Sequence, residues 1–321
     1  MKMKTLGKAM TAGRSLERTT SRRSTPVAFA LFAAATLLAS AACAQDFSKI
    51  EVQTTKLTDS IYMLTGGGGN LGVSVGEDSV FIVDDQYAPM TDKISAAIAK
   101  ITAKPVRFVL NTHWHGDHTG GNENFGKGGS LIVAHENVRK RMSVEQFIEA
   151  FNMRTQAALP VALPVVTFTQ SVTLHVNGDE IRAIHMPNAH TDGDAVVHFL
   201  KNDVLHMGDI YFNGMYPFID DATGGSVEGV IAACDKVDAI VGDKTKVIPG
   251  HGPLSNKAEL KAYRDMLVTV SGRVKDMIRQ GKRLEEITAS DITKDLDEKW
   301  GKGFIKGPKF VEMLAKAQLK R

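Results

Sequence analysis

Three histidines and an aspartate lie within six consecutive residues of this chain, at His113, His115, Asp117 and His118. They directly follow the apolar run 106–110, where a buried strand is expected to pass into a loop. In an extended chain His113 and His115 project to the same side, because side-chain direction repeats every second residue, so both can reach one metal ion. Asp117 and His118 then turn toward a second ion. Imidazole and carboxylate groups are typical zinc ligands, so the pattern predicts a metal site.

Further candidate ligands stand at the ends of other apolar runs. A catalytic zinc site uses about three protein ligands and a solvent position, so two ions need more donors than one loop supplies. Residues in suitable positions are His190, Asp209 and His251. The remaining histidines are interpreted as core or surface residues: His135, His175, His185, His198 and His206.

The motif H-x-H-x-D-H at 113–118 resembles the signature of the metallo-β-lactamase superfamily, and the resemblance extends over about residues 61–253. It implies an α/β fold, a four-layer αββα sandwich with the metals at one edge. It also implies two ligand sets: His113, His115 and His190 for the first ion, Asp117, His118 and His251 for the second, and Asp209 bridging both. Asp84, after the apolar run 80–83, also matches a family position and is expected to orient the ligand loop without binding metal.

The chemistry that this resemblance implies is hydrolysis. A metal lowers the pKa of a bound water from 15.7 to roughly 7, so a water shared by two ions becomes a bridging hydroxide that attacks the substrate. Asp117 is then both a ligand and the catalytic acceptor of the hydroxide's hydrogen bond. The expected cofactor is two Zn²⁺ ions, and bridged carboxylate sites also take iron or manganese. Tyr211, close to Asp209 in the chain, is predicted to donate to a substrate oxygen.

The elements that must position these residues follow from apolar periodicity and turn residues. Strands are predicted at 60–65, 71–75, 79–83, 106–110, 171–176, 180–185, 195–200, 204–206 and 246–249. Helices are predicted at 90–101, 143–158, 227–241 and 258–278. Gly66 to Gly69 join the first two predicted strands, and no P-loop pattern accompanies them. We therefore interpret these glycines as a hairpin turn or a flap that covers the metals, and not as a phosphate-binding loop.

The first 44 residues read as a signal peptide. Seven Lys and Arg residues precede the uncharged run 27–42, and Ala42-Cys43-Ala44 supplies a cleavage pattern. Ser21-Arg22-Arg23 resembles a twin-arginine signal, and ordinary Sec export is the alternative. We therefore expect a single periplasmic hydrolase domain at 45–321, with no membrane span in the mature chain.

Removal of this leader changes the net charge of the chain from +3 to about −3, because seven positive charges and one negative charge are lost. A negative net charge disfavours nucleic acid as a partner. Cys234 is the one cysteine left after cleavage, so no intramolecular disulfide is expected, and Cys234 is interpreted as a buried packing residue.

The expected substrate is a small molecule containing a cyclic amide or ester, a β-lactam or a lactone. Gly208-Asp209 resembles the glyoxalase II, lactonase and nuclease branches of the superfamily, whereas class B β-lactamases lack the bridging aspartate. Export argues against an intracellular glutathione thioester. A helical insertion predicted at 143–164 has room to shape a pocket for a small apolar substrate. Two alternatives remain: a thioester hydrolase of the glyoxalase II kind, and a non-catalytic metal-binding protein on the same fold.

Overall fold

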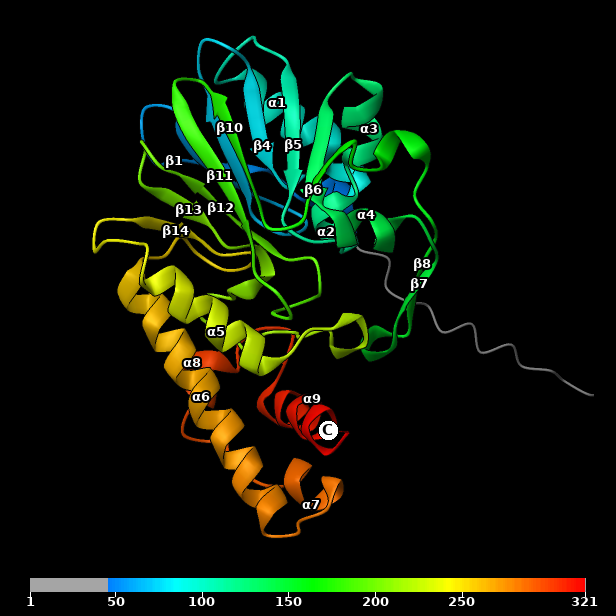
Figure 1. Ribbon diagram of the computed structural model, residues 1–321, viewed down its shortest axis with the longest axis vertical. Helices are drawn as coiled ribbons and strands as arrows, with labels where there is room; N and C mark the ends of the chain where they lie inside the picture. Colours follow the sequence, from blue (N-terminus) through cyan, green and yellow to red (C-terminus); the bar gives the residue numbers. More distant parts are fainter. Residues whose placement is uncertain (1–45, 321) are drawn as a thin grey trace, which may run out of the picture. The chain divides into compact units, whose positions relative to one another are not determined.

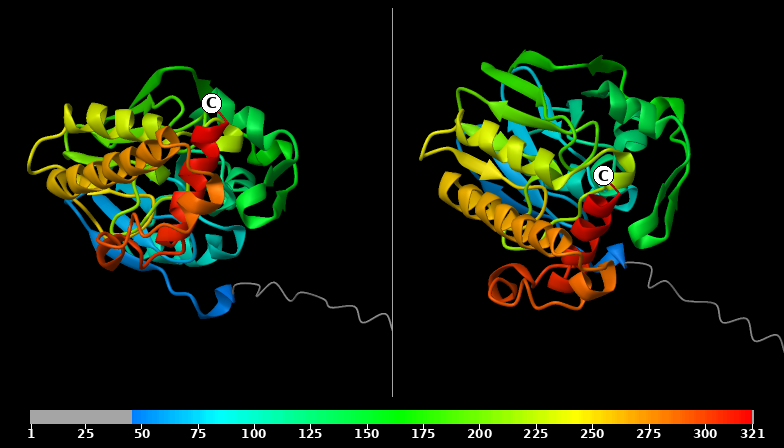
Figure 2. Two further views of the ribbon diagram at one scale, coloured as in Figure 1. Left: turned by 90° about the horizontal axis from the view of Figure 1, so that it is seen from below. Right: turned by 60° about the horizontal axis from the view of Figure 1, so that its bottom comes forward.

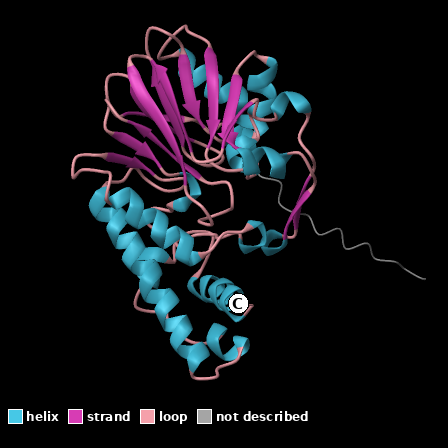
Figure 3. Cartoon of the chain, in the orientation of Figure 1, coloured by secondary structure: helices cyan, strands magenta, loops and turns pink. Residues whose placement is uncertain are grey.

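A computed structural model describes residues 46–320 of the chain. The predicted signal peptide at 1–44 lies outside the described residues. Two β-sheets face each other, and helices cover the outer face of each sheet (Figures 1 and 3). No helix within residues 46–320 is both long and apolar enough to cross a membrane.

The first sheet has seven strands in the order β1-β2-β3-β4-β5-β6-β9. Its strands are β1 (Gln53–Lys56), β2 (Ile61–Thr65), β3 (Leu71–Val75), β4 (Val80–Val83), β5 (Val106–Asn111), β6 (Leu131–His135) and β9 (Val166–Phe168). Pairing is antiparallel from β1 to β4 and parallel from β4 to β9. Two helices, α1 (Thr91–Ala99) and α3 (Asn122–Lys127), contribute apolar side chains to the core on its outer face.

The second sheet has five strands in the order β10-β11-β12-β13-β14. They are β10 (Ser171–Val176), β11 (Asp179–His185), β12 (Ala195–Phe199), β13 (Val204–His206) and β14 (Lys246–Ile248). Helices α5 (Val227–Asp238) and α6 (Lys257–Arg279) lie on its outer side. They are followed in the chain by α7 (Leu284–Thr288), α8 (Asp297–Trp300) and α9 (Gly307–Leu319), and α7 packs against α6 and α9. Figure 2 shows α9 lying against α6 on this side of the molecule.

Three apolar cores hold the layers together. Phe81 and Val83 of the first sheet pack with Val197 and Phe199 of the second in the central core. The two outer cores join each sheet to its helices. Cys234, a residue of α5, is buried in the core that also contains the apolar side chains of α6. Burial of apolar side chains stabilises such layers by roughly 25 cal/mol per Å². The αββα sandwich predicted from the sequence is therefore confirmed.

The predicted helix at 143–158 is wrong. Helix α4 (Glu136–Met142) ends before it, and the segment forms a hairpin of β7 (Gln146–Ile148) and β8 (Met153–Thr155). Asn152 adopts a left-handed backbone with φ of 48° at the turn, which asparagine tolerates better than most residues. Phe147 and Met153 are exposed on this hairpin, so they do not face the core.

The loops that carry the candidate ligands meet at one edge of the sandwich. Asp84 follows β4 and residues 113–118 follow β5, and these two strands are parallel. Asp209 follows β13 and His251 follows β14, which are also parallel. His190 lies in the loop that enters β12, at the same edge because β12 runs antiparallel to β13. The strand directions thus gather residues that are far apart in the sequence.

Candidate metal centre

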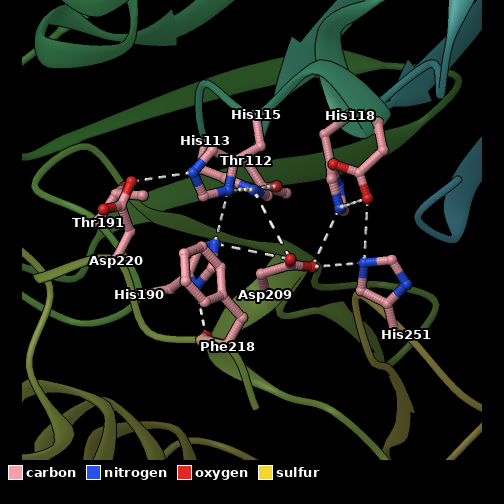
Figure 4. A network of polar contacts seen from close by, with 12 residues as sticks. Thr112, His113, His115, His118, His190, Thr191, Asp209, Phe218, Asp220 and His251 are labelled. Atoms are coloured by element: carbon pink, nitrogen blue, oxygen red, sulfur yellow. Dashed lines mark hydrogen bonds and ion pairs between the residues drawn. The ribbon is translucent and has the colours of Figure 1, made fainter. Parts of the chain in front are cut away.

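The first group of side chains contains His113, His115, His190 and Asp209, all of them buried. His115 Nδ1 lies 3.1 Å from His113 Nε2 and 2.9 Å from His190 Nε2. Asp209 Oδ2 lies 3.8 Å from His113 Nε2 and 3.6 Å from His190 Nε2. Three imidazole nitrogens and one carboxylate oxygen therefore face a common point (Figure 4).

The second group contains Asp117, His118 and His251. Asp117 Oδ2 lies 3.6 Å from His118 Nε2 and 3.2 Å from His251 Nε2. The other oxygen of Asp209, Oδ1, lies 3.0 Å from His118 Nε2 and 3.4 Å from His251 Nε2. Asp209 thus presents one oxygen to each group. The side chains of Asp117 and His251 are 21% and 20% exposed, so solvent reaches the second group.

Two buried atoms in the second group lack a hydrogen-bond partner. They are His118 Nε2 and Asp209 Oδ1, which lie 3.0 Å apart without the alignment of a hydrogen bond. A buried polar atom without a partner costs about 1–3 kcal/mol, and a cation between the two atoms removes that cost. Imidazole and carboxylate donors suit zinc, and they also suit iron and manganese. The residues present therefore fit a pair of divalent metal ions.

Asp84 orients ligands of both groups. Its Oδ2 lies 2.7 Å from His118 Nδ1, so the carboxylate accepts a hydrogen bond from that nitrogen and Nε2 is the atom that faces the second group. Thr112 Oγ1 donates to the same oxygen over 2.8 Å and in turn accepts from His113 Nδ1 over 3.0 Å. Asp84 has a φ of 62°, a rarely occupied conformation for a residue with a side chain. The structure places it where the sequence predicted an orienting residue.

Two further orienting groups come from the segment that follows Asp209 and were missed in the sequence. His115 Nε2 lies 3.1 Å from Asp220 Oδ2, and His190 Nδ1 donates to the Phe218 carbonyl over 2.9 Å. Asp220 Oδ2 also accepts from Thr223 Oγ1 over 2.8 Å. These contacts fix which nitrogen of each imidazole faces the metal point.

Glycines allow other loops to approach the ligands closely. Gly66 to Gly69 connect β2 and β3 as a hairpin loop, in agreement with the predicted hairpin. A side chain at Gly69 would collide with the His118 ring, and one at Gly250 would lie 2.1 Å from Asp209 Oδ1. The loop is fixed by a bond from the Gly69 amide to the Asp117 carbonyl, 3.0 Å, and by one from Gln86 Nε2 to the Gly69 carbonyl, 2.8 Å.

Burial and charge act differently on the two groups. Burial lowers the pKa of His190 to about 4 and that of His113 well below its usual value, so both rings are neutral, as metal ligands must be. Burial also acts against the charged form of His251, but the carboxylates of Asp209 and Asp117 outweigh it and raise its pKa to about 9. In the second group the carboxylates therefore stabilise the cationic form of His251, whose positive charge a divalent ion can replace.

The structure gives no support to Tyr211 as a donor to substrate. Its side chain is fully buried, and its hydroxyl lies 3.0 Å from Asn213 Oδ1 and 2.7 Å from Ser255 Oγ. The ring packs against Tyr263, with 4.9 Å between the centroids. Tyr211 is thus a core residue whose hydroxyl already has hydrogen-bond partners. It follows the turn 208–210, which separates it from Asp209.

Residues 64–262, more than half of the chain, match the metallo-beta-lactamase superfamily. The chain belongs to this superfamily. It is 22% identical over 246 residues to the beta-lactamase-like protein 2 homolog of Caenorhabditis elegans, covering 74% of this chain and 71% of the relative. It is 23% identical over 213 residues to the metallo-beta-lactamase type 2 of Bacteroides fragilis, covering 63% of this chain and 80% of that protein.

Solved structures of the superfamily share the fold. The metallo-beta-lactamase from Pontibacter korlensis superposes with a TM-score of 0.55 and 18% identity, covering 68% of this chain and 99% of the other. At that identity the likeness concerns the fold alone. Together with the His and Asp cluster, membership of the superfamily identifies the protein as a hydrolase with a divalent-metal site.

Proposed function

We propose that this protein is a dinuclear zinc hydrolase that opens a cyclic amide or ester, a β-lactam or a lactone, in the periplasm. The observation that carries the proposal is the position of Asp209, whose two oxygens face two separate groups of ligands. His113, His115 and His190 would hold one ion with Asp209 Oδ2. Asp117, His118 and His251 would hold the other with Asp209 Oδ1.

The bound ions supply a water of lowered pKa and a Lewis acid for the substrate oxygen. The side chains around them supply position. Asp84, Asp220 and the Phe218 carbonyl hold the imidazole rings in fixed orientations, so little reorganisation accompanies the reaction. Asp117 is the partly exposed carboxylate at the solvent side of the site, where it can accept a hydrogen bond from the attacking water and direct its lone pair.

Three features support a cyclic amide or ester as substrate. One relative, from Bacteroides fragilis, is a metallo-beta-lactamase by name. Asp209 resembles the bridging aspartate of the lactonase branch, which glyoxalase II enzymes share and class B β-lactamases lack, so it favours the lactone over the β-lactam. The predicted signal peptide favours a substrate outside the cytoplasm and thus argues against the glutathione thioester.

The experiment is a substrate comparison with purified zinc-loaded mature protein. Nitrocefin, an acyl-homoserine lactone and a glutathione thioester are assayed side by side, and we expect hydrolysis of the lactam or the lactone. Turnover of the thioester alone would replace the proposal with a glyoxalase II activity. Metal binding without turnover of any ester, amide or phosphodiester would indicate a non-catalytic metal-binding protein. Fractionation of cells that express the full chain tests export.

A further inference from the structure

Three phenylalanines form a continuous surface beside the metal centre: Phe151, Phe218 and Phe304, called here the aromatic wall. The Phe218 ring lies 5.8 Å from the rings of both His115 and His190, measured between centroids. The Phe151 ring lies 4.7 Å from Phe218 and 6.4 Å from Phe304. The wall therefore begins at the rings of the first ligand group and extends outward.

Phe304 closes the wall on the side of the second ligand group. Its ring lies 6.2 Å from that of His251 and 6.0 Å from Phe212, and Phe212 stacks on His251 at 5.1 Å. The aromatic wall thus spans the distance between the two candidate metal positions. An apolar group held against it would lie beside a carbonyl that reacts at the metal centre.

Two of the three rings are exposed, and the backbone beside Phe304 is anchored. Phe151 is 44% exposed and Phe304 is 55% exposed. Phe304 lies between Gly303, which packs against Met215, and Ile305, which is buried. Exposed apolar surface next to a polar site is typical of ligand binding, because burying an aromatic side chain is favourable.

The exposed rings stand on segments that carry none of the candidate metal ligands. Phe151 belongs to the connection of the β7–β8 hairpin. Phe304 lies between α8 and α9, outside residues 64–262, which match the superfamily. A feature built from such segments is suited to setting the choice of substrate, whereas the metal ligands set the reaction.

The wall is apolar and carries no cation over its rings. Within residues 46–320, the cation–ring contacts are those of Arg154 with Phe147 and of Lys299 with Trp300. Recognition of a substrate carboxylate typically uses a fixed arginine or lysine. The apolar rings of the wall themselves therefore favour an uncharged substituent.

We propose that the aromatic wall binds the apolar substituent, an acyl chain or an aromatic ring, of an uncharged lactone or lactam whose carbonyl reacts at the metal centre. This inference rests on the proposed hydrolase function. Phe151 and Phe304 are specificity-determining residues in this account: they hold the substituent, and removal of either ring shortens the surface available to it.

The test measures binding apart from turnover. N-octanoyl- and N-acetyl-homoserine lactam, stable analogues of the lactones, are titrated calorimetrically into zinc-loaded mature protein. Because each buried methylene adds about 0.8 kcal/mol, the octanoyl compound should bind at least about tenfold more tightly even when its chain is only partly covered. Phe304→Ala and Phe151→Ala should each reduce this ratio about fivefold or more without changing the zinc content.

Phe147→Ala is the matched control. It removes the same kind of side chain from the same hairpin, with 43% exposure, but its ring lies over Arg154. It should leave the binding ratio unchanged. The inference is refuted if wild-type protein binds both analogues equally, if the two wall variants keep the wild-type ratio, or if Phe147→Ala lowers it as much. Chain-dependent binding without hydrolysis of N-octanoyl-homoserine lactone would refute the lactonase function and still support the wall.

Discussion

Gly69 lies so close to His118 that a methyl group has no space between them. A Cβ at position 69 would lie 2.1 Å from His118 Cε1 and 2.4 Å from Nε2, whereas carbon atoms in contact stand about 3.5–4.0 Å apart. The backbone is held on both sides, by the Asp117 carbonyl and by Gln86 Nε2. Gly69→Ala must therefore shift the imidazole by more than about 1 Å, a displacement that can lower turnover ~100-fold.

The assay combines zinc content by mass spectrometry with the hydrolysis rate of the purified variant. We expect the ion of the second group to be lost and the ion of the first group to be retained, because Gly69 contacts His118 and not His113. Gly272→Ala in α6 is the control, since a Cβ there meets no atom within 4 Å. A Gly69→Ala protein with two ions and the wild-type rate would refute this packing argument.

Three further substitutions test the orienting groups. Asp220→Asn removes the charge beside His115 Nε2 and should weaken zinc binding at the first group about 10–100-fold, measured by competition with a chelator. Asp221→Asn is the control: it alters an exposed ion pair with Lys320 and should leave zinc binding unchanged. Asp84→Asn should lower the zinc affinity of both groups, because the Asp84 carboxylate orients His118 directly and orients His113 through the Thr112 hydroxyl. Unchanged zinc affinity at either group would contradict that link. Tyr211→Phe should keep the wild-type rate and lower the free energy of unfolding by about 1 kcal/mol, measured by urea denaturation, because only a buried hydrogen bond is lost; a large fall in rate would restore Tyr211 to the site.

The layers of the fold could be predicted because strand and helix periodicities are strong where one face is buried. The strand predicted at 106–110 is β5 (106–111), and the helix predicted at 258–278 is α6 (257–279). The hairpin at 146–155 could not be distinguished from a helix, because its strands are three residues long and its spacing of apolar residues also suits a helix. Short strands leave too few alternations to set a period.

The four candidate ligands at 113–118 were predictable because they are dense in one motif that follows an apolar strand, and the resemblance to the superfamily added the other three. Asp220 has neither property: it stands beside Asp221 in a loop, and only the tertiary structure brings it to His115. Tyr211 shows the converse, since closeness to Asp209 in the chain does not determine where a side chain points. Phe304 gave no sequence signal, because a single phenylalanine in a loop acquires meaning only from its distance to His251.

The most direct test of the account is the metal content of the purified mature protein, measured together with its hydrolysis rate before and after chelation. The account predicts two divalent ions per chain, complete loss of turnover in the metal-free protein, and recovery when zinc is added back. A metal-free protein that keeps its hydrolytic rate, or one that binds no ion at His113, His118 and their neighbours, would contradict it.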